Sequence, residues 1–133
     1  MSRHSVRGLF VSLLVLAAGN VVAQDVVLSV PLVQLILFPE RYESEVRVEV
    51  VGFLTREAGL SLFMNRELAE VGDYASSIVV EEGPSGEIMS SPCEGYVRIQ
   101  GSAITFLGGL TLGKIERIEV AGTGEVCWQR SLE

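Results

Sequence analysis

Histidine and lysine are almost absent from this 133-residue sequence, and both shortages restrict the chemistry that it can perform. The single histidine is His4 and the single lysine is Lys114. His4 lies in an N-terminal segment that we expect to be removed, which leaves no imidazole in the mature chain. Catalytic pairs that activate a serine or cysteine nucleophile through histidine are thereby excluded. With only two cysteines as remaining soft ligands, a conventional zinc site is excluded as well, and we expect no metal and no other cofactor.

The first 23 residues have the pattern of an export signal. Arg3 and Arg7 form a positive start, residues 9–18 are apolar, and Ala23 supplies the small residue that a signal peptidase reads. The alternative is an uncleaved membrane anchor, but the apolar run is shorter than the roughly 20 residues that cross a bilayer. We therefore predict that residues 1–23 are a signal peptide. Residues 24–133 would then form a single domain, periplasmic or secreted, with no stable membrane anchor.

Acidic residues outnumber basic ones along the whole chain. The sequence has 10 lysines and arginines against 17 aspartates and glutamates, and a formal net charge of −7. Removal of the signal would take away Arg3 and Arg7 but no acid, so that the mature chain would carry about −9. A nucleic-acid partner needs clustered lysine and arginine to neutralise its phosphates. We therefore expect no nucleic acid among the partners.

Cysteine occurs only twice, as Cys93 and Cys127, 34 positions apart. In an oxidising compartment an even pair predicts one disulfide. The chain-entropy model gives a loop of this length a stabilisation on the order of 3–4 kcal/mol. The alternative, two free or redox-active thiols, lacks the C-x-x-C spacing that would support it.

Alternating apolar residues predict a chain built mainly from short strands. A short helix comes first, because Leu32, Leu35 and Ile36 form one apolar stripe. The longest strand is expected over residues 46–54. Its alternation slips at two adjacent valines, which predicts a bulge or a sharp coil near Gly52. The other expected elements are strands over residues 60–64, 77–81, 96–101 and 110–120, and a helical stretch over residues 66–71. Together they predict a mainly β fold, a small five-stranded barrel with a short N-terminal helix. A different small barrel or a β-sandwich would satisfy the same pattern.

The opening of the mature domain resembles a known group of proteins. Residues 32–42 read Leu-Val-Gln-Leu-Ile-Leu-Phe-Pro-Glu-Arg-Tyr, a helix that ends in Pro-Glu-x-Tyr, and residues 46–54 follow as V-x-V-x-x-x-G-x-L. The likeness continues through Leu-Phe-Met-Asn-Arg-Glu at residues 62–67 and Tyr-Val-Arg-Ile-Gln-Gly at residues 96–101. This arrangement resembles small uncharacterised bacterial proteins with an OB-like fold, although Glu-Ser-Glu at residues 43–45 replaces an expected Gly-Lys turn. The resemblance implies an OB-like barrel over residues 24–133 and carries no catalytic residue across.

Barrels of this kind bind ligands across an exposed sheet face and through the neighbouring loops. The candidate contacts, on the expected wet strand faces and adjoining turns, are Arg47, Arg56, Arg66, Arg98 and Gln100. The alternative for each of them is an ordinary solvated side chain. We expect an exported binding or protein-interaction module without enzymatic activity, whose partner is a small ligand or an envelope protein.

Two other functions stay open at this point. A glycan-acting enzyme needs only two carboxylates, for which Glu57 and Glu67 are the candidates. An inhibitor or envelope-assembly factor would engage another protein through the breaker-rich loop at residues 83–92, because binding residues concentrate on loops held by a rigid scaffold.

Overall fold

The computed structural model describes residues 26–42, 45–83, 86–106 and 109–131. The predicted signal peptide, residues 1–23, lies outside the described residues, as do Glu43 and Ser44 of the connector before the first long strand and Pro84 and Ser85 of the loop at residues 83–92. Within the described residues, no helix is both long and apolar enough to cross a membrane.

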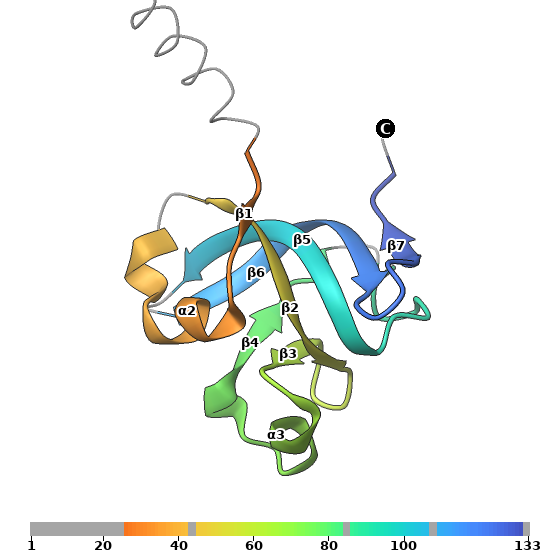
Figure 1. Cartoon of the computed structure of the whole chain (residues 1–133), viewed down its shortest axis with the longest axis horizontal. Coiled ribbons are helices and arrows are strands. Elements are labelled where there is room, and N and C mark those ends of the chain that lie inside the picture. Colours follow the sequence, from red (N-terminus) through yellow and green to blue (C-terminus); the bar gives the residue numbers. More distant parts are fainter. Residues whose placement is uncertain (1–25, 43–44, 84–85, 107–108, 132–133) are drawn as a thin grey trace, which may run out of the picture.

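Strands make up 45% of the residues that the structure describes, and five of them close into a barrel. The barrel order is β2, β3, β4, β6 and β5, with β5 pairing back onto β2. Two further strands lie outside it, β1 on β2 and β7 on β6 (Figure 1). The bounds of the strands are Leu28–Ser29 for β1, Arg47–Thr55 for β2, Ser61–Phe63 for β3, Ser77–Val80 for β4, Gly95–Phe106 for β5, Gly109–Val120 for β6 and Val126–Gln129 for β7.

The closure of the barrel is of the OB type. Strands β2, β3 and β4 pair as antiparallel neighbours, and β5 returns to pair with β2. The last gap is closed by a short parallel pairing of β4 with β6, in which Val79 and Val80 face Thr111 and Leu112. This is a five-stranded Greek-key barrel with one parallel seam. The prediction of a small OB-like barrel is therefore confirmed.

Strand β2 alternates strictly between the core and the outside. Val48, Val50 and Leu54 are buried inside the barrel, whereas Val51 between them is 46% exposed. Of the bulge or sharp coil that we predicted near Gly52, the bulge was wrong, because residues 47–54 pair with β5 without any register shift. Gly52 instead permits close packing, since a Cβ there would lie 2.7 Å from Leu62 Cγ. The adjacent valines misled the interpretation because one of them lies on the solvent side.

The irregularity of the sheet lies between β5 and β6. Gln100 pairs with Arg117 and Ser102 pairs with Gly113, so three residues of β6 lie opposite one residue of β5. One of those three, Lys114, has a φ of 46°, the left-handed region that non-glycine residues seldom adopt. This bulge re-aims β6 between its two partners, β4 along its first half and β7 along its second.

Short helices occupy the connections between strands. Helix α2 (Leu32–Leu37) is the predicted N-terminal helix, and it buries Leu32 and Leu35 in the core. The expected helical stretch over residues 66–71 is confirmed as α3 (Arg66–Glu70), which lies between β3 and β4 and is followed by the 3₁₀ turn η2 (Tyr74–Ser76). Figure 1 shows α3 at the opposite end of the barrel from β1.

The predicted disulfide between Cys93 and Cys127 is confirmed. Its sulfur atoms are 2.05 Å apart, and it ties β7 to the segment that leads into β5. Cys93 is fully buried, and Cys127 packs against the core together with Trp128. The outermost strand is therefore held to the barrel by a covalent bond and by core contacts, in addition to its pairing with β6.

Candidate functional site

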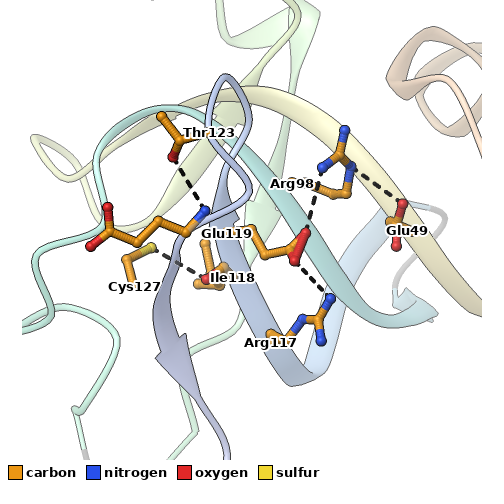
Figure 2. A network of polar contacts seen from close by, with 8 residues as sticks. Glu49, Arg98, Arg117, Ile118, Glu119, Thr123 and Cys127 are labelled. Atoms are coloured by element: carbon orange, nitrogen blue, oxygen red, sulfur yellow. Dashed lines mark hydrogen bonds and ion pairs between the residues drawn. The ribbon is translucent and has the colours of Figure 1, made fainter.

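Arg98, on the outer face of β5, is part of an internal ionic network. Its Nε lies 3.3 Å from Glu49 Oε1 on β2, and its Nη1 lies 3.4 Å from Glu119 Oε1 on β6. Glu119 also accepts a hydrogen bond of 2.7 Å from Arg117 Nη2. Figure 2 shows the Glu119 carboxylate between the two guanidinium groups, and its side chain is only 13% exposed. The network ties three adjacent strands together and leaves Arg98 committed to carboxylates of its own chain.

The other predicted contact arginines also bind groups of their own chain, either carboxylates or main-chain carbonyls. Arg47 makes a two-pronged pair with Glu116, at 3.0 and 2.9 Å. Arg66 lies 3.1 Å from Glu70 on the same helix. Arg56 donates through Nη2 to two main-chain carbonyls, of residues 91 and 93. Its Nε is buried and has no hydrogen-bond partner among the described residues. Arg56 thus fastens the β2–β3 turn to the segment that carries the disulfide.

The five predicted contact residues do not gather at one place. Arg47, Arg98 and Gln100 lie on the outer face of β2 and β5, where Gln100 pairs with Glu49 across the strands. Arg56 follows the end of β2, and Arg66 begins α3. Gln100 also lines a shallow hollow together with Glu116, Arg117, Gln129 and Arg130, all of them polar. The role of the five predicted residues as ligand contacts stays a prediction.

The remaining basic residues complete this pattern. Lys114 lies 2.8 Å from Glu45, and Arg130 donates to the carbonyl of Ile115. Arg41 lies over the ring of Phe38, with its guanidinium carbon 4.3 Å from the ring centre. Every lysine and arginine among the described residues therefore contacts an acceptor or a ring of this chain.

A different surface carries a hollow with aromatic walls. It has a volume of about 250 Å³ and lies between the outer face of β2 and β3 and the segment that holds α3 and η2. We call it the aromatic hollow, and the residues that line it are Phe53, Thr55, Glu57, Phe63, Ala69, Glu70 and Tyr74.

The walls of the aromatic hollow are held by ring contacts. Phe53 points outward from β2 and packs edge-on against Tyr96 of β5, with ring centres 5.1 Å apart. Phe63, only 1% exposed, contacts Tyr74 with ring centres 5.3 Å apart. Tyr74 itself is 52% exposed. Such aromatic pairs contribute on the order of 1 kcal/mol beyond their buried area, so they favour this arrangement of the rings before any ligand arrives.

Helix α3 is fixed over the hollow by its first turn. The side chain of Asn65 caps the helix and accepts a hydrogen bond of 2.9 Å from the N–H of Leu68. The hydroxyl of Tyr96 accepts a bond of 3.0 Å from the N–H of Arg66. Because Tyr96 also contacts Phe53, one tyrosine positions both the helix and the ring that face each other across the hollow.

Two carboxylates line the aromatic hollow beside the rings. Glu57 comes from the β2–β3 turn and forms no ion pair with any residue that the structure describes. Glu70 comes from α3 and pairs with Arg66, but both of those side chains are about two-thirds exposed. A surface pair of this kind is weak, so Glu70 can exchange its partner readily. The hollow can therefore hold the apolar part of a ligand against its rings and a positively charged group of the same ligand beside Glu57 and Glu70.

The two carboxylates of the catalytic alternative do not line the same hollow, and that alternative stays a prediction. Glu57 lines the hollow, whereas Glu67, its predicted partner, does not. The loop at residues 83–92 contributes instead to a separate hollow, which Gly83 and Glu87 line together with Trp128 and Arg130. No group of three or more histidine, cysteine, aspartate or glutamate side chains suited to a metal ion occurs in the described parts of the chain.

Sequence reasoning missed the residues that build the hollow. The position of Phe53 could have been noticed in the sequence, because it is a large apolar residue on the solvent side of a strand whose alternate residues are buried. Phe63 and Tyr74 carried none, since only the return of α3 and η2 over β3 brings them together. Comparison with protein-family models, with curated proteins and with solved structures found no match. The site is therefore argued from its own geometry.

Proposed function

We propose that this protein is an exported binding module that holds part of its partner in the aromatic hollow. The observation that carries this proposal is the combination of three rings and two carboxylates around one surface hollow, on fixed elements of the barrel. Small-molecule sites are concave and mainly apolar, with a few polar groups that set orientation. Tyr74 is exposed and Phe53 is half-buried. A ligand group that covers both rings would remove apolar surface from water, which lowers the free energy of the complex.

The position of the hollow on the barrel supports the same proposal. OB barrels bind ligands on the face of their second and third strands and through the loop between the first and second. In this chain those parts are β3, β4 and the β2–β3 turn, and the hollow is bounded by β3 and by Glu57 of that turn. The analogy between folds supports the location of the site, and the rings and carboxylates of the hollow determine what it can bind.

Export is supported by the disulfide and by the N-terminal pattern. Disulfides persist in oxidising compartments and are rare in a reducing cytosol. The bond between Cys93 and Cys127 fits the periplasm or the extracellular space, where the predicted signal peptide would deliver the chain.

A fragment screen by NMR tests the proposal. Uniformly ¹⁵N-labelled protein is titrated with small aromatic, sugar-like and amine-containing fragments, and amide shifts are followed. We expect the shifts caused by binding fragments to cluster on β2, β3, α3 and η2. In Ala69→Trp, whose indole would fill the hollow, those shifts should disappear. In Val126→Trp, which adds the same indole on the distant strand β7, they should persist. Fragments that cluster elsewhere, or that ignore Ala69→Trp, would overturn the proposal.

A further inference from the structure

The charge around the aromatic hollow identifies the class of ligand that it accepts. We propose that the hollow takes one basic side chain, an arginine or a lysine, from a segment of a partner polypeptide. Its charged end lies against Glu57 and Glu70, and its aliphatic stem lies along Phe53 and Tyr74. This inference rests on the proposed function, because it names the ligand of the same site.

The imbalance between paired and unpaired charges is the first argument. Every described lysine and arginine contacts a carboxylate, a main-chain carbonyl or a ring of this chain, whereas several carboxylates lack a positively charged partner. Glu57, Glu67, Glu81, Glu87 and Glu94 form no ion pair among the described residues. The whole sequence carries a net charge of −7. Arg41, Arg56 and Arg130 also lack an ion pair among the described residues, but they are fewer than the unpaired carboxylates. A protein with this acidic excess attracts a positive partner, and its field speeds that encounter.

The rings supply the second argument. A cation near the face of a phenylalanine or tyrosine ring is attracted by the ring's quadrupole. This chain already uses that contact once, where Arg41 lies 4.3 Å from the centre of the Phe38 ring. Long basic side chains also lay their methylene groups on apolar surface while their charged ends stay near water or carboxylate. Rings in the walls and carboxylates at the rim match both halves of such a side chain.

The size of the hollow is the third argument. Its volume of about 250 Å³ lies below the range of about 300–1,000 Å³ that is usual for whole small-molecule ligands. A single long side chain needs less room. The surface beside the hollow continues as exposed apolar residues, Val51 on the same face of β2 and Tyr96 against Phe53. Those residues provide contact area for the neighbouring residues of a polypeptide, which a free amine would leave uncovered.

Arg66 shows the proposed contact within the chain. Its Nε lies 3.1 Å from Glu70 Oε1, and both side chains are open to solvent. A ligand arginine would compete with Arg66 for the same carboxylate. Removal of the Arg66 charge should therefore strengthen ligand binding, whereas a residue that merely solubilises the helix would have no such effect.

The test uses short capped peptides that differ at one central residue. An arginine peptide is compared with its citrulline, lysine and glutamate counterparts by titration calorimetry on the mature, oxidised protein. Citrulline keeps the shape of arginine and removes the charge. We expect the arginine peptide to bind about tenfold more tightly than the citrulline peptide, the glutamate peptide not to bind, and the arginine preference to shrink at high salt.

Single variants then show which carboxylates bind the charged group of the peptide arginine. Glu57→Gln and Glu70→Gln should each weaken the arginine peptide by about threefold, and Arg66→Gln should strengthen it by about twofold. Glu87→Gln removes the same charge from another surface and should change the affinity by less than about 1.5-fold. Equal binding of the citrulline and arginine peptides, or an equal loss in Glu87→Gln and Glu57→Gln, would overturn the inference. If neutral fragments still occupy the hollow, the proposed function survives that failure; if Ala69→Trp has no effect on any ligand, both fail.

Discussion

The effect of the disulfide between Cys93 and Cys127 on stability can be calculated from its place in the chain. The bond joins residues 34 positions apart in the chain. Its reduction leaves both sulfur atoms in place, so that core packing around the fully buried Cys93 is retained. Reduction therefore isolates the effect of the cross-link from the effect of losing side-chain volume. We predict that the reduced protein remains folded but loses much of its stability.

The magnitude follows from the length of the loop. In the chain-entropy model a cross-link over 34 residues removes conformational freedom from the unfolded chain worth about 4 kcal/mol at 25 °C. With a urea slope of about 2 kcal/mol/M for a domain of this size, that loss lowers the midpoint of unfolding by about 2 M. The slope itself should rise on reduction, because an unfolded chain without the cross-link exposes more surface.

Urea unfolding followed by the fluorescence of the single tryptophan, Trp128, measures both quantities. Oxidised protein and protein in excess reductant are compared, with reductant-treated Cys93→Ala/Cys127→Ala as the control for reduction itself. That double variant should unfold at the same midpoint with and without reductant. A shift of less than about 0.5 M for the wild type would refute the reasoning, since the cross-link would then contribute almost nothing.

Three other predictions concern single residues, each checked by urea unfolding. Gly52→Ala should cost about 1–3 kcal/mol, because the added methyl would meet Leu62 Cγ at 2.7 Å, whereas Gly122→Ala, with open space around it, should cost nothing. Leu35→Ala, at a fully buried position of α2, should cost about 2–5 kcal/mol, and Leu37→Ala, at a 62% exposed position of the same helix, less than about 0.5 kcal/mol. Arg56→Met should cost about 1–3 kcal/mol by leaving two main-chain carbonyls without their donor. A reversed order within either pair, or a neutral Arg56→Met, would contradict the packing described.

The fold could be predicted from the sequence because its signals are local. The alternation of valines in β2 places Val48 and Val50 in the core, where both are fully buried. The spacing of Leu32 and Leu35 predicts one face of a helix, and the structure buries both. The bulge prediction failed for a physical reason: an apolar residue need not be buried, and Val51 lies on the wet face.

The site could not be predicted because its contacts are distant in the sequence. Whether Arg98 meets a ligand or Glu119, 21 positions further along, depends on the register between β5 and β6, which the sequence pattern does not determine. The aromatic hollow likewise depends on how α3 and η2 return over β3 after the chain leaves Phe63. The sequence does not show which partner each predicted arginine finds within the fold, a carboxylate or a main-chain carbonyl, and its role in binding stays a prediction.

The most direct test of the central claim is a measurement of contacts between a bound basic side chain and the hollow. An arginine peptide with isotope-labelled side-chain carbons is added to the mature protein, and intermolecular nuclear Overhauser effects are recorded. We expect contacts from the arginine methylene protons to the ring protons of Phe53 and Tyr74, and we expect Ala69→Trp to abolish them. Saturable binding with contacts to Trp128 instead, or with none to these two rings, would contradict it.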